Sequence, residues 1–333
     1  NPDYSSTEEL LRDADTAMYR AKAAGKAGYV VFDQEMYAQA RARLRVETEL
    51  RQALDNRELR VHYQPIVTLQ TGRLLGFEAL LRWQHPVRGL LAPDEFLKVA
   101  EETGLILPIG WWLLREACRQ TRAWRDRHPE ARGLSMAVNL AHKQFMYAGL
   151  PQQVSAALQE TGLPADGLHL EITETVFLEN PKAAESTLRR LRALGLALHL
   201  DDFGTGYSSL SYLSALPLDT LKIDRSFVMD MEHNPKHAAI VRTIVELARD
   251  LGMNTVAEGV ESSQQLRLLE NLGCRSGQGY LFSPALDMKR ADRLFDRETL
   301  ALVPGEQAFG DTHPRGFFPG DLVRRTRDFF RRA

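Results

Sequence analysis

Cysteine is scarce in this chain: only Cys118 and Cys274 occur among 333 residues. They lie far apart and form neither a CxxC pair nor a zinc-like spacing. So few cysteines are typical of a reducing compartment. We therefore expect a cytoplasmic location, although the full-length parent protein could be membrane-anchored. The chain begins with Asn1 rather than Met, and we expect it to be a fragment of a longer protein.

Long apolar runs and a strong charge of one sign are also missing. No stretch approaches the roughly 20 apolar residues needed to span a bilayer, and no signal peptide is visible. The formal net charge is −2, so the chain lacks the basic excess of a general nucleic-acid binder. We expect no nucleic-acid polymer as a partner, while a site for a small anionic ligand remains possible. The composition, 44% hydrophobic and 26% charged, is that of an ordinary globular protein.

The first 56 residues have a helical pattern. Apolar residues recur at helical spacing over residues 5–24, and residues 29–32 resemble a short strand. Residues 36–56 contain no Gly or Pro and predict one amphipathic connector helix. Its apolar positions Leu44, Val46, Leu50 and Leu54 could pack on the next domain or on a second copy. A homodimer is therefore plausible.

From Leu59 onward, short apolar runs alternate with longer helical segments. The expected strands are residues 59–66, 74–81, 134–140, 168–173, 196–203, 220–223, 254–258 and 279–282. The expected helices are residues 94–102, 111–127, 152–159, 182–194, 236–251 and 263–272. Close to eight strand–helix units in about 240 residues favour an α/β fold, a (β/α)₈ TIM-like barrel, over an open sheet.

Two features set the limits of this barrel. Only residues 67–73 separate the first two strands, too few for a helical crossover, so these strands are expected to pair antiparallel. The barrel is assigned to residues 57–297, after the N-terminal segment 1–35 and the connector 36–56. Residues 298–333 form a tail whose basic end, 321–332, contains two phenylalanines. This end could touch a membrane surface, pack on the protein or be disordered.

Most of the expected strands carry a polar residue near their carboxyl end, where a (β/α)₈ barrel places its active site. These residues are Glu78, Asn139, Glu171, Asp201 with Asp202, Lys222, and Glu258. Several carboxylates converging on one mouth cannot all stay ionised without compensation. Because hard oxygen ligands occur here without a His or Cys cluster, the set favours Mg²⁺ or Mn²⁺ over zinc.

The number of ligands favours two ions. Mg²⁺ keeps several waters, so six protein ligands suit two ions bridged by one carboxylate, an arrangement fitted to attack of a metal-bound water on a phosphate ester. Lys222 would then stabilise transition-state charge; without the carboxylates it would be interpreted as a surface lysine. His169 and His199 share the faces of Glu171 and Asp201 by alternation. We expect both histidines to be hydrogen-bonded interior residues below the site, not ligands.

The motifs that carry these residues resemble the EAL family. They are residues 63–66 (YQPI), 78–83 (EALLRW), 138–140 (VNL), 171–174 (EITE), 201–210 (DDFGTGYSSL), 221–224 (LKID), 257–261 (AEGVE) and 278–280 (QGY). Members of that family are phosphodiesterases that open cyclic di-GMP to the linear dinucleotide pGpG on a (β/α)₈ barrel. The resemblance covers about residues 47 to 297, with eight motifs in the same order.

The resemblance implies a role for each site residue. A first metal would be held by Glu78, Asn139, Glu171 and Asp201, and a second by Asp201, Asp202 and Glu258, with Asp201 bridging. The catalytic residues would be Glu78, Lys222, Glu258 and Glu174, of which Lys222 assists the attacking water and Glu174 holds the loop from Asp202 to Leu210. Gln278 and Glu261 would support the ligand and the metal shell, and Gln64 and Arg82 would contact the dinucleotide.

Small departures from the family pattern spare every expected metal ligand. Ala141 and His142 follow Asn139-Leu140 where other residues are usual, and Pro284 follows Ser283 without the basic residue that often precedes it. The alternative functions are a receptor that binds cyclic di-GMP without cleaving it and a purely structural barrel. Degenerate members typically lose carboxylates or the loop, whereas this chain retains both.

The N-terminal segment carries a second resemblance. Residues 13–22 (DADTAMYRAK) and 25–29 (GKAGY) are similar to the C-terminal helix and strand of GGDEF domains, the diguanylate cyclases. The Gly-Gly-Asp-Glu-Phe signature itself is absent from the chain, so no cyclase activity is expected in these residues. The resemblance implies a GGDEF domain upstream in the full-length protein.

Overall fold

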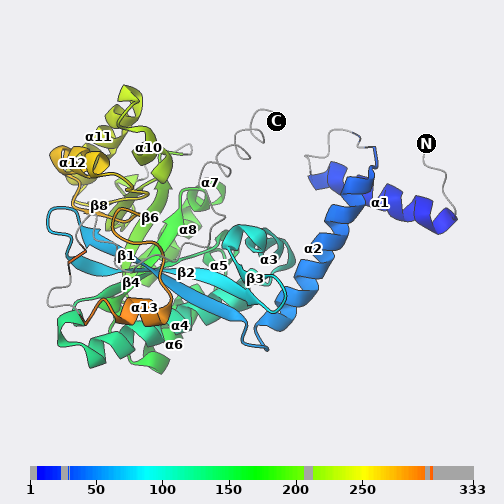
Figure 1. Cartoon of the computed structure of the whole chain (residues 1–333), viewed down its shortest axis with the longest axis horizontal. Helices are drawn as coiled ribbons and strands as arrows, with labels where there is room; N and C mark the ends of the chain where they lie inside the picture. The colour runs from blue at the N-terminus through cyan, green and yellow to red at the C-terminus, as the bar shows by residue number, and fades with distance from the viewer. Residues whose placement is uncertain (1–5, 24–28, 30, 206–212, 297–300, 303–333) are drawn as a thin grey trace.

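A closed barrel is the centre of the molecule (Figure 1). The computed structural model describes residues 6–23, 29, 31–205, 213–296 and 301–302. Its strands are β1 (Leu59–Thr68), β2 (Leu74–His85), β3 (Gly89–Leu91), β4 (Ser135–Asn139), β5 (Leu168–Thr173), β6 (Ala197–Phe203), β7 (Thr220–Ile223), β8 (Asn254–Ala257) and β9 (Ser276–Gly277). The order β1-β9-β8-β7-β6-β5-β4-β2 closes because β1 also pairs with β2, so eight of these strands form the barrel wall.

Strand β1 is the antiparallel member of the barrel. It runs antiparallel to both β2 and β9, whereas the other neighbours around the wall are parallel. The short connection between β1 and β2 leaves no room for a crossover helix, which confirms the expected α/β barrel with an irregular start. The short β3, which the sequence pattern did not predict, extends β2 as a hairpin outside the wall.

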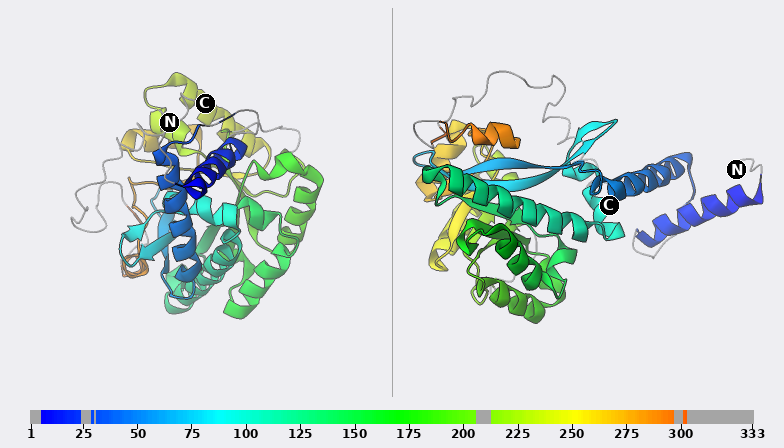
Figure 2. Two further views of the ribbon diagram at one scale, coloured as in Figure 1. Left: turned by 90° about the vertical axis from the view of Figure 1, so that its right-hand side faces the viewer. Right: turned by 90° about the horizontal axis from the view of Figure 1, so that it is seen from below.

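Helices surround the barrel (Figures 1 and 2). The described helices, including the N-terminal α1 and α2, are α1 (Thr7–Ala23), α2 (Gln34–Ala53), α3 (Leu97–Thr103), α4 (Ile106–Arg127), α5 (His142–Phe145), α6 (Leu150–Thr161), α7 (Val176–Glu179), α8 (Pro181–Arg192), α10 (Arg225–Asp230), α11 (Pro235–Asp250), α12 (Ser263–Leu272) and α13 (Met288–Asp292). The long amphipathic helices predicted for the barrel correspond to α4, α6, α8, α11 and α12. None of the described helices is long and apolar enough to cross a membrane.

The two faces of the barrel strands have different surroundings. The outward face packs on the helices, as Phe77 does against the Trp124 ring of α4 at 4.9 Å between centroids. The inward face has only a small separate apolar cluster of Ile66, Ala137 and Val256. Alternation along each strand then places polar residues at the carboxyl ends on this inner face, above that cluster.

The connector helix packs on the barrel. Leu50 is buried in the main core, and Val46 and Leu54 pack partly against it, which supports the first of the two expected roles for this face. Leu44 is 62% exposed and does not share that contact. The helix ends at Ala53, three residues before the expected end, and Arg57 then takes a positive φ of 53°. In Figures 1 and 2, α1 and the outer part of α2 project from the barrel.

Two expected strands are corrected by the structure. The last barrel strand is β9 at Ser276–Gly277, whereas residues 279–282 lie in turns, because the chain bends into the mouth at Gln278. In the expected strand 29–32, the described residues Tyr29, Val31 and Phe32 are not in a strand, and Tyr29 is 90% exposed, with no neighbouring strand among the described residues to pair with. Residues 206–212 of the DDFGTGYSSL motif and the basic tail 321–332 lie outside the described residues.

Candidate active site

Each strand of the barrel wall contributes one polar residue to the mouth. In order around the wall these are Gln64 (β1), Gln278 (after β9), Glu258 (after β8), Lys222 (β7), Asp201 (β6), Glu171 (β5), Asn139 (β4) and Glu78 (β2). Register supports this layer, because Gln64 pairs with Glu78 and Asn139 pairs with Glu171. All eight positions belong to the set expected from the sequence.

Lys222 lies at the centre of this layer with 1% of its surface exposed. Its Nζ is 2.8 Å from Glu171 Oε2, 2.8 Å from Glu258 Oε1, 3.1 Å from Asp201 Oδ1 and 3.7 Å from Glu78 Oε2. Burial lowers the pKa of Lys222, but the surrounding carboxylates outweigh this effect and hold it well above its usual value. One ammonium group is thus surrounded by four carboxyl groups, and if all of these are ionised the buried site carries an excess of negative charge.

Burial and the neighbouring negative charges both favour the protonated form of the carboxyl groups. Burial raises the pKa of Glu171 well above its usual range, against the opposing effect of the Lys222 ammonium. Burial likewise raises the pKa of Glu258 to about 8, again against Lys222 and reinforced by the charges of Asp201 and Glu78. A divalent cation would favour the ionised form of both groups.

Two neighbouring aspartates reach the same site because the backbone turns between them. Strict alternation would direct Asp201 and Asp202 to opposite faces of β6. Asp202 instead has a positive φ of 54°, and the register with β7 shifts between Leu200 and Phe203. Ligand atoms of Asp201, Asp202 and Glu258 then lie within 4.8 Å of one another, as one cation would require.

The donor atoms at the mouth fit hard divalent cations. The converging atoms are carboxylate oxygens, which Mg²⁺ and Mn²⁺ prefer. The carboxylate of Glu171 can take a further partner, because its buried Oε1 accepts no hydrogen bond. The Asn139 side chain donates its Nδ2–H to Glu78 Oε1 at 2.6 Å, which leaves the amide oxygen as a possible ligand.

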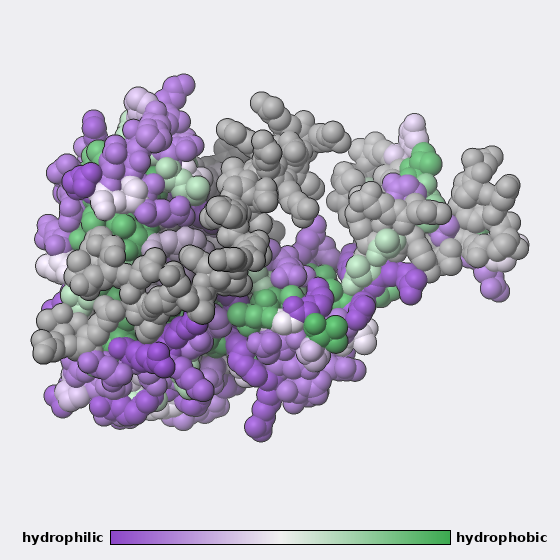
Figure 3. Space-filling view, in the orientation of Figure 1, coloured by the Kyte–Doolittle hydropathy of each residue, from purple (hydrophilic) through white to green (hydrophobic). Residues whose placement is uncertain are grey.

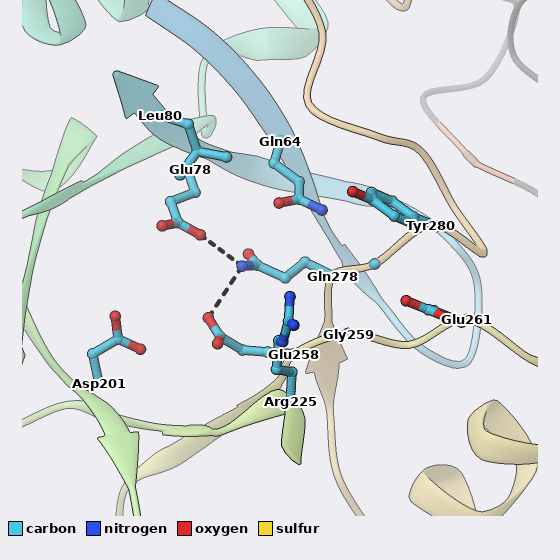
Figure 4. A pocket seen from close by; sticks show the side chains of 11 residues that line it. Gln64, Glu78, Leu80, Asp201, Arg225, Glu258, Gly259, Glu261, Gln278 and Tyr280 are labelled. Carbon is cyan, nitrogen blue, oxygen red and sulfur yellow. Dashed lines mark hydrogen bonds between the residues drawn. The ribbon is translucent and has the colours of Figure 1, made fainter. Parts of the chain in front are cut away.

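Amide groups fix the carboxylates across the mouth. Gln278 Nε2 donates to Glu78 Oε2 at 2.6 Å and to Glu258 Oε1 at 3.2 Å (Figure 4). Since Asn139 holds the other oxygen of Glu78, that carboxylate has a donor on each oxygen. Side-chain hydrogen bonds therefore connect Asn139, Glu78, Gln278 and Glu258 across the mouth.

Glu174 anchors the first part of the loop after β6. Its Oε1 accepts the backbone N–H of Gly204 at 2.9 Å, and Gly204 takes a positive φ of 96° that glycine adopts readily. Thr205 closes a turn by donating its hydroxyl to the Asp202 carbonyl at 2.8 Å. These contacts agree with the loop role expected for Glu174 over the described part of the loop.

A pocket of about 250 Å³ lies at the mouth of the barrel (Figure 4). It is lined by Gln64, Glu78, Leu80, Asp201, Arg225, Glu258, Gly259, Glu261, Gln278, Gly279 and Tyr280. Three of the residues expected to contact the ligand or support its site, Gln64, Glu261 and Gln278, are among them. Arg82 is half-buried two residues beyond Leu80 and does not line this pocket; its Nη1 donates to the Leu81 carbonyl.

Sequence reasoning missed three lining side chains. Leu80 lies two residues after Glu78 on the same strand, so alternation alone predicts that both side chains are on the same face. Tyr280 lies inside the QGY motif and is 64% exposed, and Arg225 follows the LKID motif at the first position of α10. Neither residue interrupts a buried pattern, so no rule of periodicity singles it out.

The two interior histidines lie beneath the site, as expected. Their rings are 4.6 Å apart between centroids, and burial lowers the pKa of His169 to about 4. His199 is nearly fully buried, yet its Nδ1 has no hydrogen-bond partner. The expectation that both rings are hydrogen-bonded thus does not hold for this atom.

Comparison with known proteins gives consistent matches over the barrel. The model of the EAL domain family matches residues 47–285. The chain is 47% identical over 280 residues to "Bifunctional diguanylate cyclase/cyclic di-GMP phosphodiesterase MucR" of Pseudomonas aeruginosa, covering 84% of this chain and 40% of that protein. It is 43% identical over 286 residues to "Cyclic di-GMP phosphodiesterase NbdA" of the same organism, covering 86% of this chain and 36% of that protein.

A solved structure matches the same region. The structure "PaMucR Phosphodiesterase, c-di-GMP complex" superposes with a TM-score of 0.72 at 46% identity, over 74% of this chain and 99% of that chain. The chain thus spans less than half the length of the two curated relatives, while it covers nearly all of the solved phosphodiesterase chain.

Proposed function

The chain belongs to the EAL domain family, and on that premise we propose that its barrel is a metal-dependent phosphodiesterase that hydrolyses cyclic di-GMP to linear pGpG. The observation that carries the proposal is the convergence of four carboxylates on Lys222 beside a polar pocket. The named activities of MucR and NbdA and the c-di-GMP bound in the PaMucR structure support the same substrate.

The mouth would hold two Mg²⁺ or Mn²⁺ ions. We assign Glu78, Asn139, Glu171 and Asp201 to the first ion and Asp201, Asp202 and Glu258 to the second, with Asp201 shared. Ions bound there would activate water and neutralise charge on the scissile phosphate. The convergence of the Asp201, Asp202 and Glu258 ligand atoms supports the second assignment.

Lys222 and Gln278 would organise this chemistry. Lys222 holds a fixed positive charge at the floor of the site, where it can stabilise the negative charge that develops on the phosphate oxygens. Gln278 donates to both Glu78 and Glu258 and would so hold a ligand of each ion at a fixed position relative to the other. Glu174 would keep the loop after Asp202 in its working shape through Gly204.

The pocket walls would bind the dinucleotide. Gln64, Glu261 and Gln278 offer hydrogen-bonding groups, and Arg82 would meet the part of the ligand that extends along β2. Arg225 brings a positive charge suited to a phosphate, and the exposed Tyr280 ring is suited to stack on a guanine base. The rim would therefore favour a ligand that carries both a phosphate and an aromatic base.

The chain outside the barrel suggests how the domain is used. Residues 1–35 would be the end of an upstream GGDEF-like domain, in line with the bifunctional name of MucR. The connector 36–56, packed on the barrel by Leu50, would join that domain to the barrel at residues 57–297 and could form a homodimer. We propose a cytoplasmic location for the barrel, where cyclic di-GMP would be available to it.

Turnover tests the proposal. Purified protein with Mg²⁺ or Mn²⁺ should convert cyclic di-GMP to pGpG, followed by chromatography, and EDTA should abolish the conversion. Tight binding without pGpG formation, by protein that is folded and saturated with metal, would support the receptor function instead. Absence of both binding and turnover would overturn the proposal.

A further inference from the structure

Two buried polar atoms face each other beneath the site without hydrogen bonds. His199 Nδ1 and Glu171 Oε1 are 3.7 Å apart, and neither atom has a partner. Both side chains are nearly inaccessible, with 5% of His199 and 1% of Glu171 exposed. Buried polar groups rarely stay unpaired because they lose their bonds to water, so this pair needs an explanation.

The gap between the two atoms has a local cause. The other oxygen of Glu171 accepts a hydrogen bond from Lys222 at 2.8 Å. Lys222 lies 2.8 Å from Glu258 and 3.1 Å from Asp201 as well, so its ammonium draws several carboxylates toward one point. The distance from His199 exceeds hydrogen-bond range by a few tenths of an ångström, and a small rotation of the Glu171 carboxylate would close it.

The chemistry of the ring determines which atom can donate. A neutral imidazole has one N–H and one lone pair. Once Glu171 is ionised, as cation binding requires, a lone pair on Nδ1 would repel its oxygen, whereas an Nδ1–H would be attracted to it. The favoured form therefore carries its proton on Nδ1.

We propose that His199 is a positioning residue that donates its Nδ1–H to Glu171 Oε1 and thereby fixes that carboxylate for cation binding. This inference rests on the proposed function, in which Glu171 is a ligand of the first ion. A cation held by Glu171 would compete with Lys222 for this carboxylate, and His199 would then supply it with a second partner. Partners of this kind typically change metal affinity by about 10- to 100-fold.

Metal binding to protein without substrate tests the inference. Mn²⁺ affinity, measured by isothermal titration calorimetry, should fall by about 10- to 100-fold in His199→Leu. His199→Asn places an amide N–H donor close to the position of Nδ1 and should recover part of the loss. The control His169→Gln changes the neighbouring interior histidine, which makes no hydrogen bond or ion pair with a proposed ligand among the described residues, and should alter affinity far less than His199→Leu does. Equal affinities in wild type and His199→Leu would overturn the inference.

A spectroscopic measurement on the unmodified protein covers the case in which His199→Leu does not fold. With ¹⁵N-labelled histidine and saturating Mg²⁺, the His199 signals should show a protonated Nδ1 and an unprotonated Nε2. His199→Asn identifies these signals by their loss. A proton on Nε2 alone in the Mg²⁺-bound protein would contradict the proposed donor.

These readouts separate two kinds of failure. If the expected tautomer and affinities occur without pGpG formation, the phosphodiesterase proposal fails and the positioning role stands. If turnover is normal while His199→Leu binds Mn²⁺ as well as wild type does, only the positioning role fails. If the wild-type protein binds neither cation, both proposals fail.

Discussion

The two faces of the barrel strands differ in what they bury: the outward face buries apolar side chains, and the inward face buries charged and polar ones. On the outward face, Phe77 is fully buried against Trp124 and contributes by burying apolar surface. One residue later on the same strand, Glu78 is a buried carboxylate held by two amide donors and 3.7 Å from Lys222. The outward face stabilises the fold, whereas the inward face keeps like charges together, which costs stability and offers carboxylate oxygens to a cation.

The sharpest way to separate the two faces is to change Glu78. Glu78→Ala should lower kcat by on the order of 10³-fold, because it removes a proposed ligand of the first ion and the group that Gln278 and Asn139 hold. The free energy of unfolding should change little or rise, since one like charge leaves the site. Turnover and urea unfolding measure the two quantities, with Glu246→Ala on the exposed side of α11 as the control. Near-normal turnover by Glu78→Ala would refute its assignment.

The matched change on the other face is Phe77→Ala. It should lower the free energy of unfolding by about 3–5 kcal/mol, because a large ring leaves a cavity next to Trp124. Protein that remains folded should keep its metal affinity and most of its kcat. Urea unfolding and assays below the unfolding transition check this. A loss of kcat as large as that of Glu78→Ala would show that the two faces are not separable.

The pH dependence of metal affinity follows from the inward face. Glu258, with its pKa raised to about 8, must lose its proton to bind a cation, so Mn²⁺ affinity should fall by up to about tenfold per pH unit below pH 8. For the metal-free protein the sign is the reverse. The folded state holds this proton at a pH where the unfolded state has lost it, so this group's contribution to stability falls as pH rises from about 4.5 to 8. Calorimetry and thermal unfolding across this range measure both trends. The expectation fails if affinity is flat from pH 6 to 8.

A smaller effect is expected at the rim of the pocket. Tyr280→Ala should raise KM by about 5- to 150-fold with kcat nearly unchanged, because stacking on a base contributes about 1–3 kcal/mol. Tyr280 is 64% exposed, so its truncation should leave stability intact. Tyr280→Phe, which keeps the ring, is the control and should resemble the wild type. A drop in kcat with unchanged KM would move Tyr280 from binding to chemistry.

The sequence predicted the inward face better than the rim. Each mouth residue from Glu78 to Glu258 interrupts or ends an apolar run, and this interruption can be recognised in the amino-acid sequence alone. The conformation of the loops depends on contacts within the folded protein, which the alternation of polar and apolar residues along a strand does not predict. Asp202 joins Asp201 through a left-handed turn, and β9 has only two residues, so an apolar run after it was mistaken for the strand.

Surface elements were the least predictable. The β2–β3 hairpin depends on pairing at His85 and Gly89 rather than on a strong apolar pattern. Arg225 lines the pocket because α10 begins one residue after β7 ends. Figure 3 shows a mainly hydrophilic described surface with small hydrophobic patches, which gives no further sign of the site.

The most direct test of the two-metal assignment is to locate Mn²⁺ by anomalous scattering in crystals of the protein. The account predicts two peaks at the mouth, roughly 3.5–4 Å apart, with Asp201 touching both. One peak should contact Glu78, Asn139 and Glu171, and the other Asp202 and Glu258. A mouth without peaks at saturating Mn²⁺, with Lys222 still bonded to Glu171 and Glu258, would contradict the account.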